Sequence, residues 1–195
     1  EYGLITEPVF VAIIFGAVVS SVILGPWLGY SIKKRREVSV LEYFTSRGII
    51  ADLKNTDKNT VIRELCGLAA NQDEMPDADS LYESVIQREN EMGTAMEEGI
   101  AVPHARMKFL ARPVVVFGRS AAGIEWDSPD GKPAHFIFLI LTPYGDDQTQ
   151  IQILQLIART LSEEKIRRAI MEAGTDDAIW QTLRRALTPV NILRK

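Results

Sequence analysis

The sequence is poor in the residues from which many protein chemistries are built. It has one cysteine, Cys66, and two histidines, His104 and His135, among 195 residues. A single cysteine cannot form an internal disulfide, and these three residues lack the spacing of zinc ligands. We therefore expect no metal site, and we interpret Cys66 as a thiol that fills the apolar face of a helix.

Motifs for cofactors and for several enzyme classes are also missing. The chain has no Gly-x-Ser-x-Gly elbow, no Walker-type glycine-rich loop, no dinucleotide fingerprint and no His-Glu-x-x-His. Lysine and arginine total 22 against 26 aspartates and glutamates, which gives a formal net charge of −4. A chain of this charge lacks the basic footprint of nucleic-acid-binding proteins. We expect neither a cofactor nor a nucleic-acid partner.

One long stretch near the N-terminal end lacks charge altogether. Residues 8–32 contain no charged side chain, and four consecutive cations follow from Lys33. About 20 apolar residues are enough to cross a bilayer core. A secretory signal fits poorly because the cations follow the run, and a surface anchor fits poorly because the run has no polar face. Residues 1–36 are therefore predicted to be a transmembrane helix and its basic flank, which continue an upstream membrane domain.

The apolar run has features of a helix in a polytopic bundle. Small residues recur every four positions, which would let a neighbouring backbone approach one helix face. These residues are Ala17, Ser21, Gly25 and Gly29. Pro26 is expected to kink or end the helix. The cations after the run place residues 37–195 in the cytoplasm by the positive-inside rule.

Residues 37–195 are predicted to form one acidic α/β domain. Residues 1–36 hold four basic and two acidic side chains, which leaves 18 basic and 24 acidic ones for the domain. Apolar periodicity predicts strands at 49–53, 99–102, 113–117 and 134–141, and helices after Asp57 and at 79–90, 148–161, 163–173 and 176–187. The strand at 134–141 is apolar throughout, as is typical of a central strand that is covered on both faces. We expect a mixed sheet with helices on both faces.

The two histidines are the candidates for a group that acts as an acid, a base or a nucleophile, because only their side chains have unperturbed pKa values near neutrality. His135 enters the apolar strand, where a structural, hydrogen-bonded role is favoured. His104 follows Pro103 at the end of a strand, a position from which scaffolds present reactive groups on loops. His104 is therefore the candidate site residue.

The distribution of charge around His104 is typical of an anion site. No acidic residue occurs between Gly99 and Ile124, but four cations do: Arg106, Lys108, Arg112 and Arg119. Upstream, Arg88 is the one cation among nine acidic residues between Asp73 and Glu98. Ordinary salt bridges and a solvated face are the competing interpretations. Arg88 and Arg106 would be suitable donors to a phosphate held on His104.

A specific string of residues resembles a known family. Val85–Glu89, the Gly93–Thr94–Ala95 triplet and the string Gly-Ile-Ala-Val-Pro-His-Ala-Arg at 99–106 are similar to the fructose/mannitol-type, nitrogen-regulatory-like IIA domain of the bacterial phosphotransferase system. The resemblance covers residues 39–187. It implies that His104 accepts a phosphoryl group from the phosphocarrier HPr, that Arg88 helps to hold this group, and that Thr94 is the motif threonine.

One departure from that family bears on function. Members that relay phosphate commonly carry a second histidine early in the helix after the central strand, where this sequence has the segment Gln148-Thr149-Gln150-Ile151-Gln152. We take Gln150 as the residue that stands in place of that histidine. A glutamine can donate a hydrogen bond to phosphate, but it cannot shuttle a proton. The expected phosphate-binding set is therefore Arg88, Thr94, Arg106 and Gln150, and a regulatory role gains weight over transfer to a sugar transporter.

A second resemblance concerns residues 4–32, which are similar to the last membrane helix of a cation/proton antiporter. The first hypothesis is therefore a cytoplasmic IIA-like domain on an antiporter in the bacterial inner membrane, phosphorylated on His104. The second is an enzyme component that passes phosphate to a sugar permease. The third is a module that binds an anion or a partner and is never phosphorylated.

Overall fold

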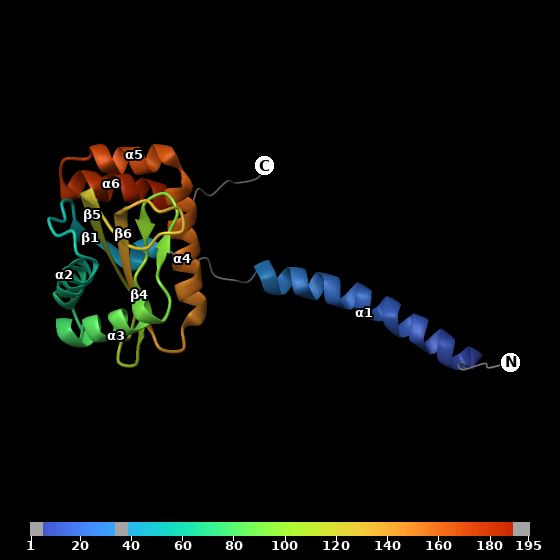
Figure 1. The fold of residues 1–195 in the computed structure, drawn as a ribbon. Helices are drawn as coiled ribbons and strands as arrows, with labels where there is room; N and C mark the ends of the chain where they lie inside the picture. Colours follow the sequence, from blue (N-terminus) through green and yellow to red (C-terminus); the bar gives the residue numbers. More distant parts are fainter. Residues whose placement is uncertain (1–5, 34–38, 189–195) are drawn as a thin grey trace. The chain divides into compact units, whose positions relative to one another are not determined.

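The computed structural model describes residues 6–33 and 39–188, which belong to two compact units divided after Glu37 (Figure 1). The first unit holds α1 (Glu7–Lys33), and its segment Glu7–Trp27, with a mean hydropathy of 2.4, is long and apolar enough to cross a membrane. Pro26 lies inside α1, so the alternative that it ends the helix is wrong. The expected basic residues 34–36 lie outside the described residues.

The second unit alternates helices and strands. In chain order it contains η1 (Val40–Glu42), β1 (Phe44–Ile50), α2 (Lys58–Ala70), α3 (Ala78–Glu91), β2 (Ala95–Met96), β3 (Ile100–Ala101), β4 (His104–Met107), β5 (Val114–Ile124), β6 (Ala134–Pro143), α4 (Asp147–Ser162), α5 (Glu164–Glu172) and α6 (Asp176–Leu187). The strands form one mixed sheet in the order β1-β5-β6-β3-β2, and β4 also pairs with β6. This is the predicted α/β architecture.

The sheet lies between two helical layers (Figure 1). On β6, Ile137 and Leu139 pack into the core under α2 and α3, whereas Phe136 and Phe138 pack into the core under α4, α5 and α6. This alternation follows from the period of two along a strand. The prediction that β6 is a central strand covered on both faces is confirmed.

Side-chain caps fix the starts of four helices. Asp57, Asp77, Asp146 and Thr175 each accept a hydrogen bond from a backbone amide three residues later, at the start of α2, α3, α4 and α6. Ser162 lies just before α5 but does not cap it, because its hydroxyl donates to the carbonyl of Arg159.

The strands differ more from the sequence prediction than the helices do. β1 spans Phe44–Ile50 instead of 49–53, and β5 extends to Ile124. The first half of β1 was missed because three exposed polar residues, Thr45, Ser46 and Arg47, hide its apolar pattern. β4 was not predicted at all, because only alternate residues of this short strand are buried.

Arg119 also differs from its prediction, since it does not belong to a basic surface patch. It is buried on β5, and one guanidinium nitrogen donates to the carbonyls of Ile170, Met171 and Ala173 at the end of α5. These are the carbonyls that a helix leaves without internal partners. Arg119 therefore ties α5 to the sheet.

Replacing Arg119 by methionine is expected to destabilise the second unit. The change leaves three carbonyls without their donor, which we expect to lower the free energy of unfolding by about 3 kcal/mol. Urea unfolding followed by tryptophan fluorescence measures this loss. Arg112→Met removes an exposed cation and should change stability by less than about 0.5 kcal/mol. Equal unfolding midpoints for the two variants would contradict the assigned role of Arg119.

Candidate functional site

His104 is the first residue of β4 and not part of a loop as predicted. It pairs with Ile140 of β6, and Arg106 pairs with Thr142, so both side chains share the sheet face that α4 covers. Ala105 and Met107 point the opposite way into the core under α2 and α3. The strand thus anchors itself with two side chains and presents the other two.

The imidazole of His104 is held by the chain immediately before it. Nδ1 lies 2.9 Å from the carbonyl oxygen of Val102. A carbonyl only accepts, so Nδ1 carries the proton and Nε2 is left with a free lone pair. Pro103 separates the two residues, and its ring fixes the backbone between the carbonyl and the imidazole.

The surroundings of His104 favour its neutral form. Burial lowers the pKa of His104 below its ordinary value of 6.5, and the positive charges of Arg88 and Arg106 lower this pKa further. The hydrogen bond to Val102 and the negative charge of Glu89 oppose the shift. Near neutral pH the ring is therefore uncharged, and Nε2 is available as a nucleophile or a base.

Arg88 reaches the site from the end of α3. Its guanidinium donates to the carbonyl of Met92 over 2.8 Å, which accounts for part of its hydrogen-bonding capacity. Among the described residues no carboxylate forms a salt bridge with Arg88, so the competing interpretation of an ordinary ion pair is not what the structure contains.

Glu89 is the site residue that sequence reasoning missed. Its side chain is buried, accepts hydrogen bonds from the amide and hydroxyl of Thr94 and from the indole of Trp126, and lies 3.8 Å from the ammonium of Lys58. Glu89 follows Leu81 and Val85 at four-residue intervals. A charge on that apolar stripe was the available signal.

Thr94 is turned toward Glu89 in this structure. Both its amide and its hydroxyl donate to that carboxylate, and its carbonyl accepts from the amide of Val102 over 3.1 Å. The role of Thr94 as a phosphate ligand stays a prediction, and the contacts described give it a second role as the residue that ties the end of α3 to the segment before His104.

Arg106 and Gln150, two residues of the predicted phosphate-binding set, are hydrogen-bonded to each other. Nε of Arg106 donates to Oε1 of Gln150 over 2.7 Å, and a terminal nitrogen of the same guanidinium lies 3.0 Å from Asp147. Gln150 is buried in the first turns of α4, whereas Arg106 is about half exposed. Gln150 therefore contributes an amide oxygen that is bonded to a cation.

Four large apolar side chains are exposed within residues 39–188. They are Met92, Phe109, Tyr144 and Ile151, and Phe109 is 90% exposed. The backbones of three of them adjoin residues of this group. The carbonyl of Met92 accepts from Arg88, the amide of Tyr144 donates to Met107 at the end of β4, and Ile151 follows Gln150.

The remaining candidates have structural roles or no clear chemistry. Nδ1 of His135 bonds the carbonyl of Ser120, as expected of a structural histidine. Burial raises the pKa of Cys66 to about 12, so the thiol is inert. No cluster of three potential metal ligands occurs among the described residues.

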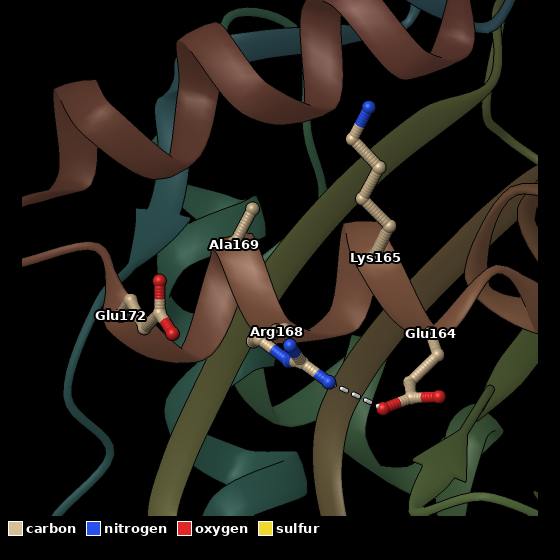
Figure 2. Close-up of a pocket in the computed structure, with 5 residues that line it drawn as sticks. All are labelled: Glu164, Lys165, Arg168, Ala169 and Glu172. Atoms are coloured by element: carbon tan, nitrogen blue, oxygen red, sulfur yellow. Dashed lines mark hydrogen bonds and ion pairs between the residues drawn. The ribbon is translucent and has the colours of Figure 1, made fainter.

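Figure 2 shows a shallow hollow on α5 in which Arg168 pairs with Glu164. Its lining residues all come from α5, and none of them belongs to the group around His104.

The fold and the site define an α/β domain that presents a neutral, backbone-held histidine between arginines. Residues 42–186 match the model of the family described as "Phosphoenolpyruvate-dependent sugar phosphotransferase system, EIIA 2". The chain belongs to this family.

Relatives of known class agree with this assignment. The fructose-specific EIIA component of Haloferax volcanii is 34% identical over 126 residues, which are 65% of this chain and 82% of the relative. The fructose-specific EIIABC component of Bacillus subtilis is 32% identical over 142 residues, but the chain spans only 22% of that protein's length.

Solved structures share the fold. The nitrogen regulatory protein IIA-Ntr of Neisseria meningitidis has a TM-score of 0.69 at 24% identity, over 75% of this chain and 97% of that one. The mannitol enzyme IIA of Escherichia coli, solved in complex with its phosphorylated enzyme IIB, has a TM-score of 0.58 at 19% identity, over 73% of this chain and 99% of that one.

The lowered pKa of His104 predicts how stability depends on pH. Below pH 6.5 the imidazole of His104 is protonated in the unfolded chain but still neutral in the folded one. The free energy of unfolding should therefore fall as the pH drops through 6.5, and it should level off below the pKa of the folded state. His104→Asn should remove this part of the pH dependence. Urea unfolding of both proteins from pH 8 to 5 measures it, and identical pH profiles would contradict the prediction.

Proposed function

We propose that residues 37–195 are a cytoplasmic IIA-like domain that accepts a phosphoryl group on His104 from an HPr-like phosphocarrier. We further propose that the domain is attached through α1 to a cation/proton antiporter of the bacterial inner membrane and regulates it. The observation that carries the first proposal is the imidazole itself, because its proton is held at Nδ1 by Val102 and Nε2 is left unprotonated.

The proposed reaction is a transfer between two imidazoles. The lone pair of Nε2 attacks the phosphorus atom of the donor's phosphohistidine, a new N–P bond forms, and the N–P bond of the donor breaks with its electron pair returning to the donor ring. A neutral nucleophile is required, and the lowered pKa of His104 supplies it at neutral pH. Arg88 and Arg106 would offset the charge of the phosphoryl oxygens.

A protein donor is supported by exposed apolar side chains whose backbones adjoin the site. Met92, Tyr144 and Ile151 are exposed, and their backbones adjoin Arg88, Met107 and Gln150. Apolar side chains of this size gain free energy when a partner covers them.

Regulation of an antiporter is supported by two features of the chain. Gln150 stands where a relay domain commonly has an imidazole, so the site holds a phosphoryl group with fixed donors and has no second titrating ring at that position. The apolar helix α1 supplies a membrane attachment by length and composition. Phosphorylation would add about 1.5 to 2 negative charges beside Arg106 and could change the docking of the domain on the transporter.

The second candidate function is that of a sugar-specific IIA component. It is favoured by the identity of 34% to the fructose-specific EIIA component of Haloferax volcanii. In this case the phosphoryl group would move from His104 to the next component of a sugar permease, and the domain would act as a phosphotransfer enzyme. An unphosphorylated anion- or partner-binding module is the third alternative.

The full chain in detergent should take up one acid-labile phosphate when it is incubated with phosphoenolpyruvate, enzyme I and HPr. We expect no uptake by His104→Ala, because that change removes the acceptor nitrogen, and normal uptake by His135→Gln, because His135 only bonds a backbone carbonyl. No uptake by the folded chain, with a donor mixture that phosphorylates a known IIA protein, would leave the binding module as the function.

The regulatory proposal predicts a difference in ion transport. In vesicles that contain the transporter polypeptide to which this chain belongs, cation/proton exchange should change when the phosphate donors are supplied inside, and His104→Ala should abolish that response. If the exchange rate is the same with and without the phosphate donors, and the chain transfers phosphate to a sugar permease component, the sugar-specific function is favoured.

A further inference from the structure

A continuous line of hydrogen bonds joins the buried carboxylate of Glu89 to the imidazole of His104. Glu89 accepts from the amide and hydroxyl of Thr94, the carbonyl of Thr94 accepts from the amide of Val102 over 3.1 Å, and the carbonyl of Val102 accepts from Nδ1 of His104 over 2.9 Å. Each bond fixes the residue that makes the next one.

We propose that Glu89 is a positioning residue for His104, whose anchoring of Thr94 is transmitted through the backbone of Val102 to the Nδ1 proton. This inference rests on the proposed function, because it assigns Glu89 to the orientation of the phosphate-accepting ring. Glu89 keeps the proton on Nδ1 and therefore keeps the lone pair on Nε2.

The cost of burying Glu89 supports a role beyond packing. The side chain of Glu89 is 0% exposed, and the charged partner that the structure gives it is Lys58, at 3.8 Å and with its own side chain 27% exposed. Burying a charge costs several kcal/mol unless hydrogen bonds compensate for the lost water. Here the compensating donors are Thr94 and the indole of Trp126, and Thr94 leads directly to His104.

The line acts through the positions of its residues. The amide and the carbonyl of Thr94 belong to two different peptide units, and so do those of Val102. The carboxylate therefore holds Thr94 in place, and Thr94 in turn holds Val102. The carbonyl of Val102 is thereby better placed to accept the proton on Nδ1 than a mobile one would be.

The charges that face His104 come from the elements packed around it. Arg88 and Glu89 belong to α3, and Arg106 belongs to β4. The two arginines lower the pKa of His104, whereas the carboxylate raises it. Removing the charge of Glu89 therefore changes both the electrostatics and the hydrogen bonding at the site. A control must remove an equal charge from α3 and leave the hydrogen-bonded line intact.

Glu91 provides this control, because it is exposed on the same helix two residues after Glu89. We would compare Glu89→Gln with Glu91→Gln in the full chain in detergent, labelled with ¹⁵N-histidine. The chain has two histidines, so His104→Asn assigns the signals. The ¹⁵N shifts of the ring report which nitrogen carries the proton, and this readout does not depend on phosphorylation.

The wild-type chain and Glu91→Gln should keep the proton of His104 on Nδ1. Glu89→Gln should move a substantial fraction of it to Nε2, and it should slow phosphoryl acceptance on the order of tenfold without changing the KM for the donor protein. A glutamine of the same shape cannot accept every hydrogen bond that the carboxylate accepts. If Glu89 only stabilised the fold, Glu89→Gln would change neither the tautomer of His104 nor the maximal rate of phosphoryl acceptance.

The proposal is overturned if folded Glu89→Gln matches Glu91→Gln in tautomer and in rate. If Glu89→Gln does not fold, Thr94→Val removes a single hydroxyl from the line and should shift the tautomer in the same direction by a smaller amount, and an unchanged tautomer in that variant also overturns it. A wild-type chain that takes up no phosphate refutes the proposed function, whereas the tautomer comparison still decides the role of Glu89.

Discussion

The positions of His104 and Arg106 depend on β6, a strand that is paired along both edges. It pairs with β5 along one edge and with β3 and β4 along the other, and helices cover both of its faces. β3 and β4 keep one register along β6, since Ala101 pairs with Ile137 and His104 with Ile140. β3 and β4 are therefore two segments of one extended stretch of chain beside β6.

Pro103 separates those two parts and creates the site. It has no amide to donate, so the ladder is interrupted where the chain passes Val102 and Pro103, although the carbonyl of Pro103 still accepts from Ile140. The carbonyl of Val102 accepts from Nδ1 of His104. A buried, rigid strand thus imposes the orientation of a partly exposed side chain.

The parts of the fold that apolar periodicity controls could be predicted from the sequence, and those set by tertiary contacts could not. The helices from α2 to α6 and strand β6 follow their apolar patterns, because burial selects those residues directly. β4 has a functional outer face, so its pattern carries little signal. Arg119 was misread because a count of charges along the chain does not show that the guanidinium is buried against α5.

The candidate site shows the same division. His104, Arg88 and Arg106 could be selected from residue type and local charge. In the structure both arginines lie close enough to His104 for their charges to lower its pKa. Glu89 was missed because its partners Thr94, Trp126 and Lys58 come from three other segments of the chain. A charged residue on an apolar helix face signals that a partner exists, but the sequence does not identify that partner.

Gln150 brings an amide to the group of residues around His104. Its oxygen accepts from Arg106 and, together with Asp147, holds that guanidinium, and the amide has no titratable proton. Under the proposed function, the fixed guanidinium would stabilise a phosphoryl group on His104, and Gln150 would exchange no proton with it. That property would suit a domain that records phosphorylation better than one that passes the phosphoryl group on.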